Sequence, residues 1–145
     1  MICKIQKLRK DLPTPFRTTE GSVGYDLYAN VDTRIGIMNG QSVLIPTGIK
    51  IAIESGYEVQ IRPRSGLALN YGITVLNSPG TIDSDYRGEL GVILINHSDK
   101  AFIVKHGMRI AQMVFNKVEL PDLEEVDNLD ETKRGDGGFG STGKK

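Results

Sequence analysis

The sequence predicts an all-β protein, either a sandwich or a barrel, and a jelly roll is one of the main options. Short apolar runs follow one another along most of the chain, with turn-forming residues between them. Apolar and polar residues alternate with a period of two in segments 50–53 and 57–61, as they do in half-buried strands. Only one internal stretch has the composition of a helix. With 145 residues, the chain is large enough for one domain with its own core.

The expected strands are 2–8, 25–28, 33–38, 42–45, 48–53, 57–62, 73–76, 89–96, 102–104 and 109–118. Turn signals separate them, namely Asn39-Gly40, Pro46, Ser55-Gly56, Ser78-Pro79-Gly80 and Ser98-Asp99. Segment 91–95, with the sequence GVILI, is apolar on both faces. It is therefore expected to be a central strand.

The one expected helix lies in the sequence RSGLALNYG, residues 64–72. Ser65 fits the N-cap, the following Leu and Ala residues favour a helix, and Gly72 marks its end. The helix has room for only two turns.

Composition changes after Pro121, where acidic residues and then glycines replace the apolar runs. Such a segment cannot bury enough apolar surface to order itself. We therefore expect a folded domain over residues 1–121 and an appended, flexible C-terminal arm over residues 122–145.

Charge and composition exclude several classes of function. Lys plus Arg and Asp plus Glu both number 18, so the formal net charge is zero and no broad field attracts nucleic acid or an anionic membrane. No apolar run is long enough to span a membrane, and no secretory signal is visible. Cys3 is the only cysteine, so an internal disulfide is impossible. We expect a reducing, cytoplasmic setting.

The terminal sequence RGDGGFGSTGKK matches several short patterns. Its glycines fit a dinucleotide fingerprint and most of a Walker A loop, but neither pattern has the strand and helix that it requires. The Arg-Gly-Asp tripeptide would need an extracellular context. Phe139 distinguishes the segment from a plain tail, because a mobile lid could stack this ring on a ligand while Arg134 pairs with phosphate. A plain solvated tail remains the alternative at this stage.

Two other segments carry candidate binding groups. Arg64, the Ser65 hydroxyl and the first N–H groups of the helix could converge on an anion, although Ser65 alone could be a simple cap. Asp26 stands inside an otherwise apolar strand, where an acid needs a partner or a role.

Segment 76–90 reads as a hairpin connection between strands 73–76 and 89–95. Backbone groups at such a turn could read the edge of a flat base, and Asp83 and Asp85 could serve as a base or as metal partners. The alternative is that Asp, Ser and Gly are ordinary turn formers and that Tyr86 covers the core. Arg109 and Gln112 in the last strand could likewise be part of a solvated strand face.

Five blocks in order, VGYDLYA, PRSGLA, NSPGTIDSDYRGEL, GMRIAQ and RGDGGFGSTG, resemble the homotrimeric dUTPase family. They span residues 23–143, and the third and fifth are long and specific. The resemblance implies a distorted, β-clip-like jelly roll and a dUTP diphosphatase that converts dUTP to dUMP and pyrophosphate with Mg²⁺. This activity keeps uracil out of DNA and supplies dUMP for dTMP synthesis. The resemblance also implies a homotrimer with three active sites, each built from all three chains.

The resemblance also assigns roles to residues. Asp83 is similar to the base that activates water for in-line attack on the α-phosphorus, and Tyr86 to the tyrosine that packs under the deoxyribose. Asp26 matches an acid that reaches Mg²⁺ through water, the ion being held mainly by substrate phosphates. Arg134 matches a catalytic arginine that acts much like an arginine finger. Positions that match substrate-binding residues are Arg64, Ser65, Gly66, Asn77, Gly80, Thr81, Ile82, Asp83, Tyr86, Gln112, Arg134, Phe139, Gly140, Ser141 and Thr142.

Gly91 departs from many relatives, which carry a longer side chain such as Lys or Met there. A backbone contact to the base could survive this change, but a side-chain contact could not. The rival activities are a dCTP deaminase or bifunctional relative and a dUTPase-like regulatory binding protein. No deaminase signature is visible, and Tyr86 together with the Phe139 arm favours the hydrolase over the deaminase. Asp83 and the arm argue against a catalytically inactive binding protein.

Overall fold

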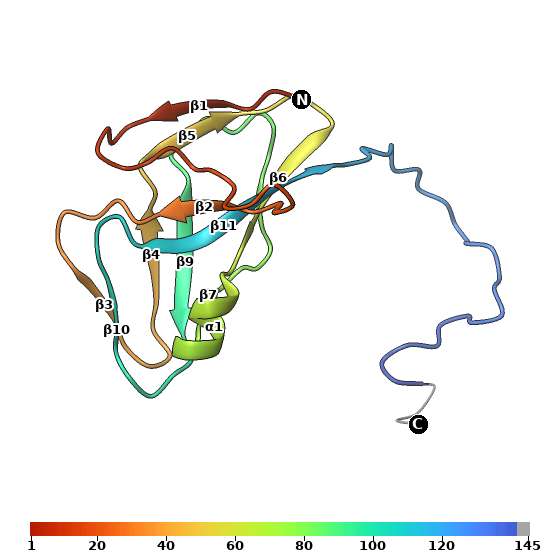
Figure 1. Cartoon of the computed structure of the whole chain (residues 1–145). Coiled ribbons are helices and arrows are strands. Elements are labelled where there is room, and N and C mark those ends of the chain that lie inside the picture. Colours follow the sequence, from red (N-terminus) through yellow and green to blue (C-terminus); the bar gives the residue numbers. More distant parts are fainter. Residues whose placement is uncertain (142–145) are drawn as a thin grey trace.

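A computed structural model describes residues 1–141 of the chain, and it confirms the all-β prediction (Figure 1). Strands make up nearly all of the regular structure, and one short helix interrupts them. The elements are β1 (Lys4–Lys7), β2 (Tyr25–Tyr28), β3 (Ile35–Ile37), β4 (Ser42–Pro46), β5 (Ile49–Ala52), β6 (Tyr57–Arg62), α1 (Ser65–Tyr71), β7 (Ile73–Val75), β8 (Gly80–Ile82), β9 (Gly91–Asn96), β10 (Phe102–Val104) and β11 (Arg109–Lys117).

The strands pair antiparallel in small sheets that share one core. The largest sheet has the order β2-β11-β6-β8, the next has the order β4-β9-β7, and β1-β5 and β3-β10 are two-stranded. Every sheet contributes to one cluster of buried aliphatic side chains, as Leu27, Ile51 and Leu94 illustrate. Burial of this apolar surface is the main favourable term for folding.

Strand β9 confirms the expectation of a central position, because it pairs with β4 on one side and β7 on the other. Val92 and Leu94 point into the core, whereas Ile93 and Ile95 on the opposite face are only half-buried. The continuous apolar run is thus explained by one core face and one partly covered face.

The hairpin predicted for segment 76–90 needs correction. Strands β7 and β9 do pair antiparallel, with Ile73 opposite Asn96. Their connection, however, contains β8, which crosses to the other sheet and pairs with β6. Gly80-Thr81-Ile82 is only three residues long and is flanked by turn-forming residues, so its sequence does not identify it as a strand. Its pairing with distant β6 decides its conformation.

The start of α1 was also mispredicted. Arg64, with an extended backbone (φ −91°, ψ 127°), is the N-cap, while Ser65 is the first helical residue, and no side chain caps the helix. The predicted end is confirmed: Gly72 adopts the left-handed conformation (φ 63°, ψ 22°), and its N–H donates to Ala68 O at 3.1 Å.

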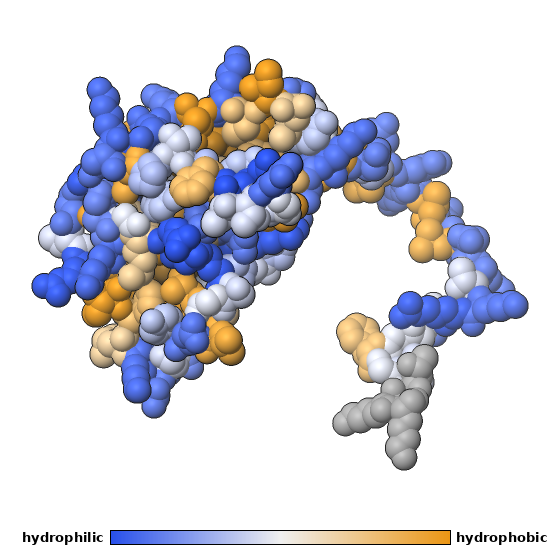
Figure 2. All heavy atoms as spheres, in the orientation of Figure 1, coloured by the Kyte–Doolittle hydropathy of each residue, from blue (hydrophilic) through white to orange (hydrophobic). Residues whose placement is uncertain are grey.

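After β11 the chain leaves the sheets. The last backbone bond to the body joins Val118 N–H to Gly56 O at 3.0 Å, and residues 121–141 contain no helix or strand. Figure 1 shows this blue segment leading away from the sheets, and Figure 2 shows that it is mainly hydrophilic with isolated apolar side chains. The division into a domain of residues 1–121 and a flexible arm stays a prediction. No helix within residues 1–141 is long and apolar enough to cross a membrane.

Candidate functional site

Asp26 on β2 binds two arginines. Its Oδ1 accepts from Arg64 Nε at 3.0 Å, and its Oδ2 accepts from Arg109 Nη1 at 3.1 Å. The Asp26 side chain is only 15% exposed, so its desolvation must be offset, and charge-assisted bonds of this kind do so. The expectation that this acid has a partner is confirmed.

A bulge in β11 explains why Arg109 reaches Asp26. Arg109 pairs with Tyr28, and the register shifts before Ala111, so Gln112 pairs with Asp26. Residues three apart in a regular strand face opposite sides, but one extra residue brings both onto the same side. The sequence placed Arg109 on a strand face. It carries no clear signal for the bulge that turns Arg109 toward Asp26.

Gln112 completes this group, which we call the Asp26 cluster (Asp26, Arg64, Arg109 and Gln112). Its Nε2 donates to Pro63 O at 3.0 Å, directly before Arg64. Arg64 Nη1 also donates to Arg109 O at 3.3 Å. Burial and the nearby Asp26 charge raise the pKa of the Tyr28 phenol. Ser65 and Gly66 follow Arg64 as the exposed first residues of α1. The cluster thus presents two guanidinium groups around one carboxylate.

Replacing Asp26 by Asn should lower the free energy of unfolding by about 1–3 kcal/mol, because two charge-assisted bonds to a mostly buried acid are weakened. Asp32 provides the matched control, since it also pairs with an arginine, Arg9, but its side chain is 83% exposed. Its replacement by Asn should cost less than about 1 kcal/mol. Urea denaturation measures both values, and equal losses would show that burial adds nothing to the Asp26 pairing.

A hollow of about 260 Å³ brings together most of the residues of the body that are predicted to hold a nucleoside, and we call it the nucleoside hollow after this prediction. They come from the β7–β8 connection, from β8 and from the turn that follows it. The lining residues are Leu44, Asn77, Thr81, Ile82, Asp83, Tyr86, Glu89, Gly91 and Ile93. Gly80 permits the close approach of Asn77, because a Cβ there would lie 3.3 Å from Asn77 Nδ2.

The turn that follows β8 is fixed by several bonds. Tyr86 N–H donates to Asp83 O at 3.2 Å, and the Tyr86 hydroxyl donates to Glu89 O at 3.1 Å. A side chain at Gly88 would overlap the Tyr86 ring. Arg87 Nη1 donates to Ser84 O and to Tyr86 O, at 2.7 and 2.8 Å. These bonds hold the backbone at Asp83 and the ring of Tyr86.

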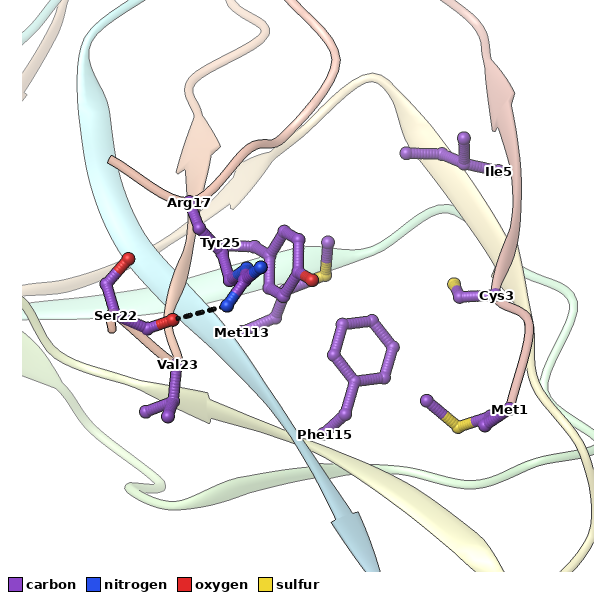
Figure 3. Close-up of a pocket in the computed structure, with 9 residues that line it drawn as sticks. All are labelled: Met1, Cys3, Ile5, Arg17, Ser22, Val23, Tyr25, Met113 and Phe115. Atoms are coloured by element: carbon purple, nitrogen blue, oxygen red, sulfur yellow. Dashed lines mark hydrogen bonds between the residues drawn. The ribbon is translucent and has the colours of Figure 1, made fainter. Parts of the chain in front are cut away.

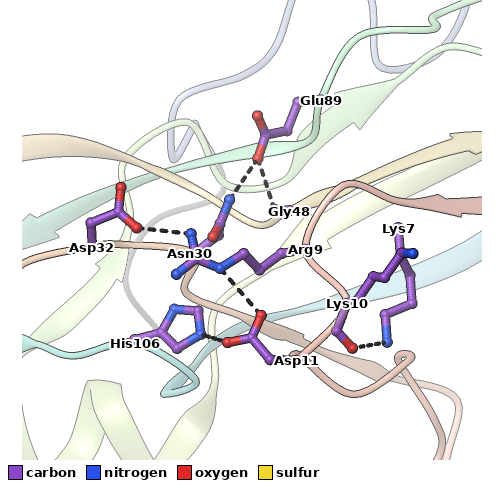
Figure 4. A network of polar contacts seen from close by, with 9 residues as sticks. All are labelled: Lys7, Arg9, Lys10, Asp11, Asn30, Asp32, Gly48, Glu89 and His106. Carbon is purple, nitrogen blue, oxygen red and sulfur yellow. Dashed lines mark hydrogen bonds and ion pairs between the residues drawn. The ribbon is translucent and has the colours of Figure 1, made fainter.

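Glu89 anchors the far end of this turn to another part of the molecule. Its Oε1 accepts from Gly48 N–H at 2.7 Å and from Asn30 Nδ2 at 3.5 Å (Figure 4). Beside it lies a more exposed network in which Asp11 binds His106 and Arg9. The hydrogen bond from His106 lowers the pKa of Asp11. This second network contains none of the predicted site residues.

Asp83 stands at the boundary of two hollows. It lines the 260 Å³ hollow and also a larger one of about 770 Å³, which it shares with Asp85 and with Leu120 at the root of the arm. Asp85 lines only the larger hollow. The two acids of this turn are therefore placed differently.

Leu44 was not expected from the sequence to lie beside Gly91. A Cβ at Gly91 would lie 2.7 Å from Leu44 Cδ1, so the exposed end of the Leu44 side chain on β4 would have to move to admit a longer residue. Strand pairing places Leu44 opposite Ile93. This pairing of β4 with β9 could not be read from the local pattern.

The arm residues lie apart from both groups. Arg134 Nε donates to Gly137 O at 2.8 Å within the arm itself, and Ser141 N–H donates to Gly138 O at 2.9 Å. The Phe139 side chain is fully exposed and has a positive φ of 50°. Predicted residue Thr142 lies outside the described residues.

A third hollow, of about 440 Å³, lies beside the N-terminal segment and contains none of the predicted site residues (Figure 3). Tyr25 and Phe115 form an edge-to-face pair in it, with ring centroids 5.4 Å apart. Cys3 lies across the hollow from Phe115, and burial raises the pKa of its thiol. Most side chains that line this hollow are apolar, and Arg17 is the charged one among them.

The dUTPase family model matches residues 10–143 of this chain. The chain belongs to the dUTPase family. It is 55% identical over 145 residues to the deoxyuridine 5'-triphosphate nucleotidohydrolase of Caldanaerobacter subterraneus subsp. tengcongensis, covering 99% of this chain and 98% of the relative. It is 56% identical over 141 residues to that of Hydrogenobaculum sp., covering 97% of each.

Solved dUTPase structures confirm the jelly-roll-like fold. The Staphylococcus bacteriophage 80alpha dUTPase with dUpNHpp superposes with a TM-score of 0.83 at 24% identity, covering 98% of each chain. The dUTPase of phage phi11 of S. aureus, whose structure details the coordination of a structural Mg(II) ion, gives a TM-score of 0.80 at 18% identity. That match covers 90% of this chain and 100% of the phage chain.

This dUTPase-family chain holds its predicted site residues in three separate groups. The nucleoside hollow contains none of the Asp26 cluster, and neither group includes an arm residue. Within residues 1–141 no hydrogen bond joins one group to another. The residues predicted to share one site therefore do not meet within the described part of a single chain.

Proposed function

We propose that this protein is a dUTP diphosphatase, which hydrolyses dUTP to dUMP and pyrophosphate and so keeps uracil out of DNA and supplies dUMP for dTMP synthesis. Membership of the dUTPase family supports the proposal. The observation that carries it here is the nucleoside hollow, in which Asp83, Asn77 and Tyr86 meet around a space with backbone from β8. A reducing, cytoplasmic setting fits Cys3, which is the only cysteine in the chain.

Base and sugar selection follow from the hollow. We propose that the Asn77 amide and the backbone of Gly80–Ile82 hydrogen-bond to uracil as a pairing base would. Groups that hydrogen-bond a substrate reject analogues that leave them unpaired. The Tyr86 ring, fixed by its own hydroxyl bond to Glu89 O and by Gly88, would pack under the deoxyribose and leave no room for a ribose 2′-OH.

Asp83 is proposed as the general base. Its carboxylate takes a proton from a water molecule, whose oxygen attacks the α-phosphorus in line with the leaving group. The bond between the α-phosphorus and the bridging oxygen breaks, and pyrophosphate leaves with that oxygen. Phosphoryl transfer needs positioning and charge neutralisation more than covalent help. Arg64 and Arg134 would provide the cationic groups for the phosphates.

The donor set fits Mg²⁺ held mainly by the substrate. Within residues 1–141, no group of three or more His, Cys, Asp or Glu side chains could form a protein cage for a metal ion. Mg²⁺ often keeps its waters and binds phosphate oxygens, so Asp26 would reach it through water. When bound with the triphosphate, Mg²⁺ supplies neutralisation of the developing negative charge.

We further propose a homotrimer with shared sites. The nucleoside hollow, the Asp26 cluster and the arm do not meet within one chain, although the proposed chemistry needs all three groups around one nucleotide. Contributions from neighbouring subunits would bring them together. In this arrangement, Phe139 stacks on the uracil, while Arg134, Ser141 and Thr142 reach the outer phosphates.

Pyrophosphate release from dUTP, UTP, dTTP and dCTP in the presence of Mg²⁺ tests the activity. We expect dUTP to be preferred by a factor of about 10² or more, because each analogue clashes with the hollow or leaves its polar groups unpaired. Equal turnover of dUTP and UTP would contradict the role of Tyr86. Ammonia release from dCTP would instead identify a deaminase.

A further inference from the structure

Gly24, two residues before Asp26, lies against the Gln112 side chain. A Cβ built on Gly24 would overlap Gln112 Oε1 and would lie 3.0 Å from Gln112 Cδ. The neighbouring Gly21 differs, because a Cβ there would meet nothing within 4 Å. A side chain at residue 24 would therefore displace the Gln112 amide, whereas a side chain at residue 21 would displace nothing.

The orientation of the Gln112 amide follows from its other neighbour. A carbonyl oxygen can only accept, so the amide must turn its NH₂ group toward Pro63 O, which lies 3.0 Å from Nε2. Oε1 then points toward Gly24. One of the two Nε2 hydrogens is used by Pro63, and the other is available to an oxygen of a phosphate held at Arg64.

The backbone of Gln112 is held by strand pairing on both sides. Gln112 lies in β11, where it pairs with Asp26 on β2 and with Arg62 on β6. The atoms that a methyl group at residue 24 would meet belong to the Gln112 side chain, so rotation of that side chain is the relief that leaves the strands in place. Such a rotation breaks the bond to Pro63 O and redirects the second N–H.

We propose that Gly24 is a positioning residue, which by having no side chain keeps the Gln112 amide oriented toward the phosphates of the substrate. The inference rests on the proposed function, and it assigns Gly24 a role that is exerted entirely through Gln112. It predicts that the two residues act as one unit in binding a triphosphate.

The test compares Gly24→Ala, Gln112→Ala, the double variant and the control Gly21→Ala. Gly24→Ala and Gln112→Ala should each lower kcat/KM for dUTP about tenfold, the size expected for one hydrogen bond to a charged group. The double variant should be no worse than the poorer single variant, because the same bond is lost only once. Gly21→Ala should match the wild type.

Inhibition by deoxyuridine, which has no phosphate, should be unchanged in all four variants, because Gln112 acts on the phosphates alone. If Gly24→Ala is poorly folded, adding Gln112→Ala should restore its melting temperature by removing the overlapping side chain. Three kinetic results would overturn the inference: a wild-type kcat/KM in Gly24→Ala, losses that multiply in the double variant, or weakened inhibition by deoxyuridine. A melting temperature of the double variant as low as that of a poorly folded Gly24→Ala would also overturn it. An inactive wild type would overturn the proposed function and this inference together.

Discussion

Replacing Asp83 by Asn is expected to lower kcat for dUTP hydrolysis by about 10²–10⁴-fold, which is the range for loss of a general base. Asn keeps the size of the side chain and its ability to hydrogen-bond, but it cannot accept a proton from water. The nucleotide contacts proposed for Asn77, Tyr86 and the β8 backbone are untouched, so the Kd for a non-hydrolysable dUTP analogue should change little. Steady-state kinetics and calorimetric titration measure the two quantities separately.

Asp85 is the matched control for this substitution. It lies on the same turn, but it lines only the larger hollow, whereas Asp83 lines the nucleoside hollow as well. Asp85→Asn should therefore retain turnover within about twofold, as expected for a residue outside the catalytic constellation. A similar loss of kcat in both variants would show that hydrolysis depends on the negative charge of the turn. It would contradict the proposal that residue 83 accepts a proton.

The sequence predicted the strands well where local pattern decides the structure. The alternating segment 57–62 became a strand with the same bounds, and the expected strand 48–53 became the shorter Ile49–Ala52, because one face of each is buried in the shared core. Gly72 ends the helix as expected, since a left-handed conformation favours glycine. These features depend on residues that are close together in the chain.

Features that depend on distant pairing could not be predicted in this way. Strand β8 exists because β6 pairs with it, and Leu44 lies beside Gly91 because β4 pairs with β9. The bulge in β11 interrupts the alternation of side chains between the two faces of the strand, and this brings Arg109 to Asp26. Each case is a relation between two segments, and neither segment shows it alone.

Site residues within the motifs were easier to find than their geometry. The resemblance named Asp83 and Arg64, and the fold places each within a defined local group. It did not indicate that Gly24 contacts Gln112, because that contact depends on the shape of a side chain. Residue identity is thus visible in sequence, while the close approach of two side chains is visible only in the structure.

Deleting residues 134–145 is expected to reduce kcat/KM for dUTP by about 10³-fold while leaving the body folded. An arginine that neutralises charge in phosphoryl transfer contributes effects of this size, and the deletion also removes the proposed stacking of Phe139. The melting temperature should be unchanged, because within residues 1–141 Arg134 bonds only to Gly137 in the arm and Phe139 is fully exposed. Arg134→Ala should reproduce most of the loss, whereas Lys133→Ala, the neighbouring cation, should not.

Mixing two inactive proteins tests whether the arm serves a neighbouring subunit. Chains that carry Asp83→Asn keep their arms, and chains that lack residues 134–145 keep Asp83. If subunits exchange at random in a trimer, about a quarter of the sites combine an intact Asp83 with an intact arm from another chain. Co-refolded mixtures should therefore regain about a quarter of the wild-type turnover, and light scattering should show trimers. A mixture that stays inactive would place the arm over the site of its own chain, because neither protein could then complete the other.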